Sequence, residues 1–211
     1  MKKKHNVVGA LGKTAVALTL ISTCLVGGTL AKYTSEVTGT GTAIAAKWSF
    51  KGNAGTNSAS ETALGSFDLA TTKTANTNVT STKIAPGDKG TVALNYDLTG
   101  TEVKTKVTAY VQVTTDQAAK LPTNLEIKTS SGSWVKASTL TNYTEIGTVT
   151  KTVTDISSTA TGKLDVEWRW ELDESGNTNK DTQDTSDGKE TTKTSTGGTI
   201  NVKLVAEQLA Q

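Results

Sequence analysis

Carboxylate side chains carry the candidate chemistry of this chain. The sole cysteine, Cys24, and the sole histidine, His5, lie in its leading segment. Residues 32–211 therefore cannot form a Cys–His or Ser–His–Asp nucleophile, and they lack the usual ligands of zinc and haem. Glu167 and Glu171 could form a hydrolytic pair, but they belong to a run of alternating charges typical of an exposed strand face. We expect no enzyme activity, no catalytic residue and no cofactor.

The segment 173–198 is acidic and rich in threonine, and it is the second place where carboxylates gather. Asn177, Asn179 and Asp181 have the alternate spacing of a calcium loop, but Thr182 stands where that loop needs glycine. A glycine also replaces the glutamate that such loops carry at their twelfth position. We therefore predict a solvated surface loop and no metal site.

Aromatic side chains are few, at 5% of the chain, so an exposed one suggests a binding role. Tyr110 lies on the polar face of a predicted strand, and Trp134 follows a Ser/Gly turn. Sugars stack on flat aromatic rings that stand at the surface. The candidate glycan-contact residues are Tyr110, Trp134 and Tyr143.

The first 31 residues have the organisation of a signal peptide: lysines open the segment, an apolar stretch follows, and small residues close it. Two other interpretations stay open, a retained membrane anchor and a lipoprotein box at Cys24. The anchor fits less well because the apolar stretch is short for a membrane span and contains several Thr and Ser residues. We predict cleavage between Ala31 and Lys32, within the recognition residues Thr29, Leu30, Ala31 and Lys32.

Removing the leader changes the electrostatics, because its four lysines turn the formal net charge from +2 to slightly negative. The remaining basic residues are scattered and include a single arginine, Arg169. A nucleic-acid surface needs clustered basic side chains with aromatic neighbours. We expect no nucleic-acid partner and no stable membrane anchor after processing.

Alternating apolar residues predict β-strands along most of the remaining chain. The clearest runs are 92–98, 103–113 and 163–172, and we expect the first two to pair as an antiparallel hairpin. Shorter strands are predicted at 42–50, 64–69, 125–127, 134–135, 143–156 and 200–205. No long helical pattern occurs, and abundant threonine suits half-exposed strands. The predicted fold is all-β, a two-sheet sandwich of the jelly-roll or immunoglobulin-like kind.

The expected organisation has three parts. Residues 1–31 form the signal peptide, residues 32–50 an N-terminal strand segment, and residues 51–211 the β-sandwich domain with the acidic loop 173–198. The N-terminal segment is either the first strand of its own domain or a donor strand for a neighbouring subunit. Its candidate assembly residues are Tyr33, Val37, Ile44, Ala46 and Trp48.

Several of these features resemble a known family. The sequence Gly-Gly-Thr-Leu-Ala at 27–31, Tyr33 after it, and the apolar strand at 42–50 are similar to exported Gram-positive proteins with an alternative signal peptide type. These are the TasA-like biofilm-matrix fibre proteins and camelysin. The Pro-Gly turn at 86–87 and the late Trp-rich strand with its Asp/Thr segment also resemble that family.

The resemblance implies a secreted jelly-roll subunit, processed by a dedicated signal peptidase, that polymerises into extracellular fibres. In members that polymerise, the freed N-terminal segment of one subunit completes a sheet of the next. The implied partners are further copies of this chain and matrix or cell-wall components, and the implied location is the extracellular matrix or cell surface. The alternative is a monomeric secreted β-sandwich module that binds carbohydrate or cell wall.

Overall fold

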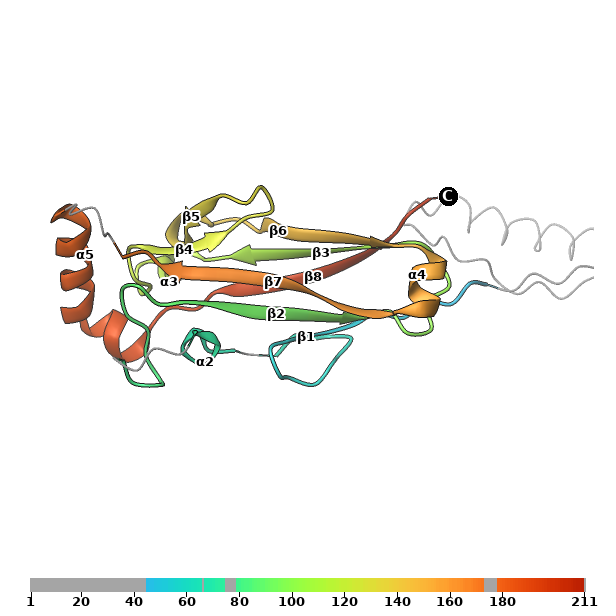
Figure 1. Cartoon of the computed structure of the whole chain (residues 1–211), viewed down its shortest axis with the longest axis horizontal. Coiled ribbons are helices and arrows are strands. Elements are labelled where there is room, and N and C mark those ends of the chain that lie inside the picture. Colours follow the sequence, from blue (N-terminus) through green and yellow to red (C-terminus); the bar gives the residue numbers. More distant parts are fainter. Residues whose placement is uncertain (1–44, 66, 75–78, 173–177, 211) are drawn as a thin grey trace, which may run out of the picture. The chain divides into compact units, whose positions relative to one another are not determined.

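The computed structural model describes residues 45–65, 67–74, 79–172 and 178–210, and nearly all of them belong to one compact unit, Ala46–Gln211. Its strands form two antiparallel sheets (Figure 1), which confirms the predicted all-β class. The strands are β1 (Lys51–Ala54), β2 (Lys89–Asp97), β3 (Thr105–Gln112), β4 (Leu125–Lys128), β5 (Trp134–Lys136), β6 (Thr144–Lys151), β7 (Thr161–Trp170) and β8 (Asn201–Gln208).

The sheets have the strand orders β1-β2-β7-β4-β5 and β6-β3-β8. Residues of both sheets share one hydrophobic core, so the arrangement is sandwich-like. The predicted alternation in β2, β3 and β7 is confirmed, because the residues expected to face inward are buried. The fully enclosed ones include Val92, Leu94, Val107, Ala109, Val111 and Trp168.

The predicted hairpin between the first two long strands is wrong. β2 pairs with β7 along its whole length, from Lys89 opposite Arg169 to Asp97 opposite Thr161, while β3 pairs with β6 and β8 in the other sheet. The hydrogen bond from the Leu98 N–H to the Ala160 carbonyl extends the pairing with β7, and the chain then crosses to the other sheet before β3 begins at Thr105. An alternating pattern fixes which side chains face the core, but not which strand lies alongside.

Three shorter strand predictions also differ from the structure. The described residues 45–50 contain no strand, and the first strand begins at Lys51. The described residues 64–65 and 67–68 form no strand either, and Leu69 opens the short helix α2 (Leu69–Thr72). The predicted strand at 143–156 ends at Lys151, where Thr152 and Asp155 form a capping box that starts α4 (Val153–Ser158).

The acidic segment contains a helix, which corrects the loop expected at 173–198. In its described part, α5 (Thr178–Lys189) is followed by the π-helical turn η2 (Thr192–Thr196). The remaining short elements are α3 (Thr115–Ala118) and η1 (Ala137–Thr139). Figure 1 shows α5 and α4 at opposite ends of the strands.

The helix α5 is held against the rest of the domain by polar contacts and not by an apolar face. The Asp184 Oδ1 atom accepts hydrogen bonds from Trp170 Nε1 at 2.8 Å and Asn124 Nδ2 at 3.0 Å. The buried Asp187 carboxylate accepts from the Thr123 N–H at 2.5 Å and from Lys193 Nζ at 2.6 Å. Because these anchors are carboxylates, hydrophobic periodicity gives no sign of the helix.

Asp187→Ala is expected to release α5 without unfolding the sheets. Breaking a buried ion pair typically costs about 3–5 kcal/mol, and here the loss falls on contacts between α5, the Thr123 loop and Lys193. Amide hydrogen exchange in 178–196 should therefore accelerate while exchange in β2 and β7 stays slow. Asp181→Ala, which removes an exposed carboxylate from the same helix, is the control. Equal acceleration in both variants would contradict the prediction.

Candidate assembly groove

β8 is an edge strand, and its free side is the principal candidate site. Among the described residues it pairs with β3 on one side only, so alternate backbone N–H and C=O groups of residues 201–207 point away from that sheet. Its inward-facing Val202, Leu204 and Ala206 lie opposite Val111, Ala109 and Val107. The three β3 residues are fully buried, whereas those of β8 stay partly exposed. The core is therefore incompletely covered along this edge.

A groove of about 610 Å³ runs beside β8, and its far wall comes from the other sheet. In that wall the following chain segment covers the edge of β1. Gly52 and Ser60 exchange backbone hydrogen bonds of 2.8 and 2.9 Å, and the Ala54 N–H donates to the Leu64 carbonyl. The edge of β1 is thus covered, whereas no described strand pairs with the far side of β8. The groove is lined by Phe50, Gly52, 60–65, Phe67, Tyr143 and 199–204.

The opposite open side of the two sheets has a different character. Beside the other edge strand, β6, lies a depression lined by charged side chains that include Lys128, Glu145, Asp165 and Glu167. Charges at a sheet edge oppose the addition of another strand. The groove also has charged residues, Glu61 and Lys203, in its lining, but Phe50, Leu64, Phe67, Val202 and Leu204 give it the larger apolar share, and this favours the β8 edge as the surface for a further strand.

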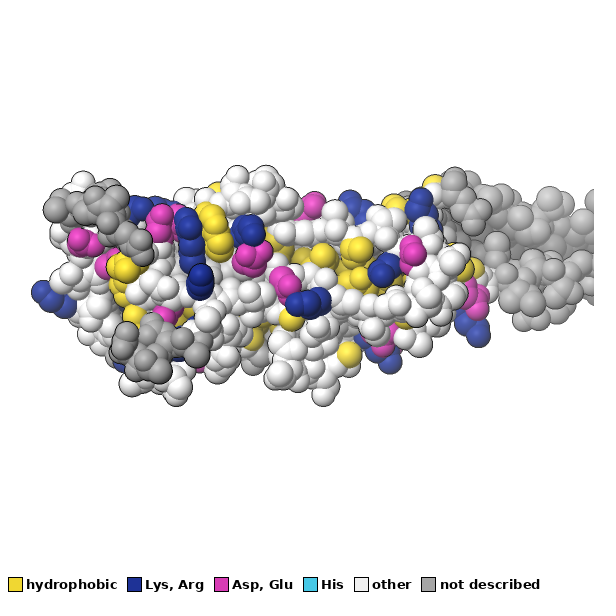
Figure 2. All heavy atoms as spheres, viewed as in Figure 1, with side chains coloured by type: hydrophobic (Ala, Val, Ile, Leu, Met, Phe, Trp, Pro, Cys, Tyr) yellow, Lys and Arg dark blue, Asp and Glu magenta, His cyan; other side chains and the backbone are white. Residues whose placement is uncertain are grey.

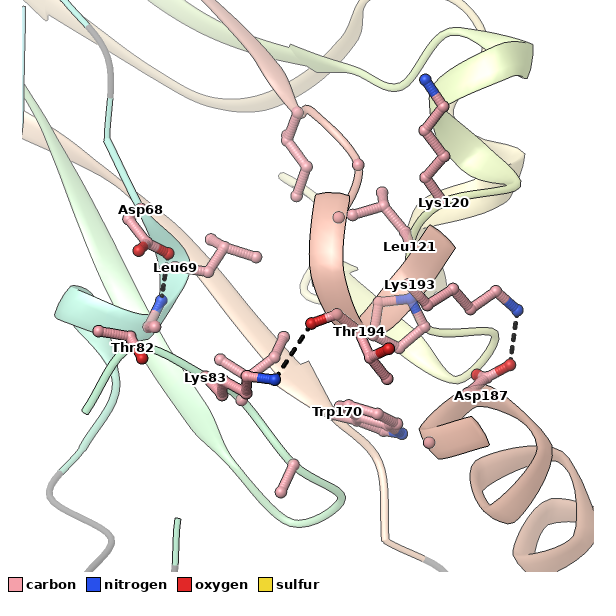
Figure 3. A pocket seen from close by; sticks show the side chains of 18 of the residues that line it. Asp68, Leu69, Thr82, Lys83, Lys120, Leu121, Trp170, Asp187, Lys193 and Thr194 are labelled. Carbon is pink, nitrogen blue, oxygen red and sulfur yellow. Dashed lines mark hydrogen bonds and ion pairs between the residues drawn. The ribbon is translucent and has the colours of Figure 1, made fainter. Parts of the chain in front are cut away.

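The groove continues into a second cavity of about 610 Å³, here called the end pocket, which lies where β8 begins. Phe67, Thr199 and Ile200 line both spaces. Figure 3 shows its walls, with Leu69 on one side, Leu121 on the other and Trp170 between them. A hydrogen bond from Lys83 Nζ to the Thr194 carbonyl joins the two sides. The end pocket has an apolar floor and a polar rim.

The rim is held by charged groups that are already paired. Burial by itself would lower the pKa of Lys193, but hydrogen bonds and charges from Asp187 and Glu190 outweigh burial and raise it above its ordinary value of 10.5. A raised lysine pKa stabilises the fold at neutral pH, and this stabilisation is lost as the pH rises through the folded-state pKa. The pair is therefore intact under ordinary conditions, and it serves to position α5.

The predicted assembly residues divide at the boundary of the folded unit. Tyr33, Val37 and Ile44 lie outside the described residues, as do the cleavage residues Thr29 to Lys32. Ala46 and Trp48 belong to the unit and are partly buried. Between them, the Lys47 carbonyl accepts the Glu102 N–H at 2.9 Å and the Lys47 N–H donates to the Glu102 carboxylate. The chain is thus fixed to its own domain from Lys47 onward.

Two of the three candidate glycan-contact residues come together. The ammonium of Lys203 lies 4.2 Å from the ring centre of Tyr143 and 5.0 Å from that of Tyr110. Trp134 lies on the other sheet, where the Arg169 guanidinium stacks 4.5 Å from its ring centre. Tyr143 is 43% exposed and lines the groove. Sequence reasoning missed Lys203, whose only signal is its place between the inward-facing residues of the last strand.

The described residues contain no group of three or more Asp, Glu, His or Cys side chains arranged to hold a metal ion. In the same residues, no helix is long and apolar enough to cross a membrane. Figure 2 shows one face of the molecule on which uncharged polar surface prevails and charges of both signs are scattered. The distinctive feature of the described unit is therefore the open edge with its groove.

Comparison of the chain with protein-family models, curated proteins and solved structures found no match.

Proposed function

We propose that this protein is a secreted structural subunit of an extracellular fibre or biofilm matrix, in which the N-terminal segment of one subunit adds as a strand to the next. The observation that carries the proposal is that, in the described part of the chain, no second strand pairs with β8 along residues 201–207, beside a largely apolar groove. An added strand would hydrogen-bond to the outward-pointing backbone groups of residues 201–207 and cover the half-exposed Val202 and Leu204. With that strand in place, the sandwich would have the jelly-roll character that the family resemblance implies.

The donor is the segment between the expected cleavage site and the folded unit, residues 32–45. Fully extended, its fourteen residues span about 46 Å at roughly 3.3 Å per residue. The eight residues of β8 span about 26 Å on the same basis. The segment is therefore long enough to cover the whole edge, and export must precede the cleavage that frees it.

The positions of the two ends favour an open polymer over a closed dimer. The chain enters the domain beside Glu102, and the end of β8 lies close by, since Leu209 N donates to the Lys104 carbonyl. The end pocket lies at the other end of β8. A tail would leave one subunit at the end beside Glu102 and enter the next subunit at the end that holds the end pocket. The two subunits then contribute different surfaces, which makes the contact heterologous. Such a contact repeats without closing on two subunits.

Truncation of the tail tests the proposal. Protein beginning at Lys32 should form high-mass assemblies, and protein beginning at Ala46 should stay monomeric with its sheets folded, because only the first retains a strand to donate. Light scattering after size-exclusion chromatography measures mass, and urea unfolding confirms the fold of the truncated form.

If both forms are monomeric, or both assemble equally, strand donation is excluded. Capture of a monomeric full-length form on peptidoglycan or glycan, lost in Tyr143→Ala, would instead support the alternative of a carbohydrate- or wall-binding module. Partners other than the chain itself would then be cell-wall components. Imaging of the cell surface by negative stain would separate a fibre from a dispersed matrix component.

A further inference from the structure

The direction of the added strand follows from where the tail leaves the domain, if the proposed function holds. Lys47 is bound at the end of the unit where β8 finishes. If subunits stack facing the same way, the tail of the neighbouring subunit reaches this subunit at the other end of β8, beside Ile200. The tail residues closest to the neighbour's own domain then lie beside Ile200, and the residues nearer the N-terminus lie farther along β8. The tail then runs antiparallel to β8. A tail folded back onto its own β8 would run parallel, so direction distinguishes exchange between subunits from self-pairing.

Side-chain alternation leaves two choices for the face that enters the groove. One face of the tail carries Ile44 with the threonines 42, 40 and 38, and the other carries Ala43, Gly41, Gly39 and Val37. The groove is walled by Val202 and Leu204, which stay partly exposed. Glycine has no side chain to fill such a space, whereas β-branched residues pack well on a strand surface. The Ile/Thr face fits the groove.

The end pocket then receives the largest side chain of that face. Ile200, the residue just before β8 begins, is the apolar residue on this side that lines both groove and end pocket, and the end pocket continues past it to Leu69, Leu121 and Trp170. A tail residue opposite Ile200 would place its side chain over this apolar floor. Only two residues, 45 and 46, would then separate Ile44 from the bound Lys47 of its own subunit. Successive domains would therefore be in contact.

Gly39 and Gly41, on the other face of the tail, would lie near the tyrosine pair of the acceptor subunit. With Ile44 opposite Ile200, Gly41 lies opposite Lys203, next to the Tyr110 and Tyr143 rings that Lys203 holds together. Tyr143 is the more exposed ring and also lines the groove. An aromatic ring that covers a glycine across strands stabilises the pair and fixes register. Bulky residues at 39 and 41 would displace that ring.

From these contacts we infer the register of assembly. The tail of a second copy runs antiparallel to β8 with Ile44 in the end pocket opposite Ile200, and with threonines 42, 40 and 38 opposite Val202, Leu204 and Ala206. Ile44 is the anchoring side chain, and Gly39 and Gly41 face the tyrosine pair. This inference rests on the proposed function and specifies the partner segment residue by residue.

Engineered disulfides test the register, because the chain after the leader contains no cysteine. The double variant Thr42→Cys/Val202→Cys is expressed with its leader, recovered after export and oxidised mildly. Directly opposed residues have Cβ atoms about 4.5–5.5 Å apart, which a disulfide can bridge with a small adjustment. We expect a ladder of covalent oligomers on denaturing gels without reductant. The matched control is Ala43→Cys/Val202→Cys, whose cysteines would project from opposite faces.

The control should give at least about tenfold less cross-linked product, because its Cβ atoms point apart. A stronger ladder from the control, or no ladder from either variant while light scattering still detects assemblies, would overturn the register but leave strand donation standing. A mature protein that stays monomeric in light scattering, with neither variant cross-linked, is the result expected of self-pairing, because a folded-back tail starts where β8 finishes and keeps Thr42 away from Val202. That result would overturn the proposed function as well.

Discussion

Val202→Lys is expected to keep the mature protein monomeric. Val202 faces the groove opposite Val111, and a lysine there would place an ammonium where the added strand must pack. An unpaired charge enclosed between two strands costs several kcal/mol, so affinity for the tail should fall at least about 100-fold. Light scattering of the exported protein over a concentration series measures the loss. The monomer should stay folded, because the side chain is partly exposed in the absence of a partner.

Val205→Lys is the matched control for this experiment. It makes the same change on the same strand, but Val205 lies opposite Thr108 on the outer face of the sheet. Assembly should therefore be retained within a few fold. A result in which both variants assemble normally would exclude the β8 edge as the acceptor. If both fail to assemble, the outer face of β8 must also be part of the contact.

Trp168→Ala should produce the largest loss of stability. Trp168 is 0% exposed, and its Nε1 donates to the Thr72 Oγ1 at 3.0 Å, which ties α2 to β7. Its ring also lies against Gly90, where an added Cβ would come within 2.8 Å of it. Truncating a buried tryptophan removes transfer energy and leaves a cavity, at a cost of about 3–5 kcal/mol. Urea unfolding monitored by circular dichroism measures the change in the free energy of unfolding.

Trp134→Ala is the matched control, because it makes the same substitution at a tryptophan on the outer face of the same sheet. Trp134 is partly exposed and stacks with the Arg169 guanidinium, an interaction worth about 0.5–1 kcal/mol at such a site. The free energy of unfolding should therefore fall by much less than in Trp168→Ala. Comparable losses would contradict the assignment of the two indoles to core and surface.

The strands that the sequence predicted best are those with a long, strict alternation. In β7 the residues Leu164, Val166, Trp168 and Trp170 were expected on one face, and the last three are buried. Leu172 continues the same pattern but is 49% exposed, because β7 ends at Trp170. Alternation reports the face of a residue within a strand, and it carries no information about where pairing stops.

Local chemistry decided two further elements that hydrophobic patterns concealed. The capping box of Thr152 and Asp155 turns the end of the predicted strand at 143–156 into α4. The helix α5 has no apolar face and depends on the hydrogen bonds of Asp184 and Asp187 to residues far away in the sequence. Polar anchoring of this kind is invisible to periodicity, because every exposed loop carries similar residues.

The candidate site was likewise predictable in part from the sequence and in part only from the tertiary structure. The sequence pointed to residues 32–50 either as the first strand of their own domain or as a donor strand, and it named Tyr110 and Tyr143 as candidate surface aromatics. It could not name the acceptor edge. Whether β8 is central or at an edge depends on which strands lie beside it, and this is a property of the assembled sheets. Lys203, which joins the two tyrosines, became a site residue only through the β3–β8 pairing.

The amino-acid sequence by itself determined the all-β class and the inward face of each long strand, because alternation acts over neighbouring residues. It also determined that residues 32–211 contain no cysteine or histidine for chemistry. The tertiary structure alone decided that β2 and β3 lie in different sheets and that the edge of β1 is covered. It also decided that, within the described ranges, β8 has a neighbour strand on one side only and a largely apolar groove on the other. Pairing and exposure arise from contacts between distant segments, and a one-dimensional pattern does not record them.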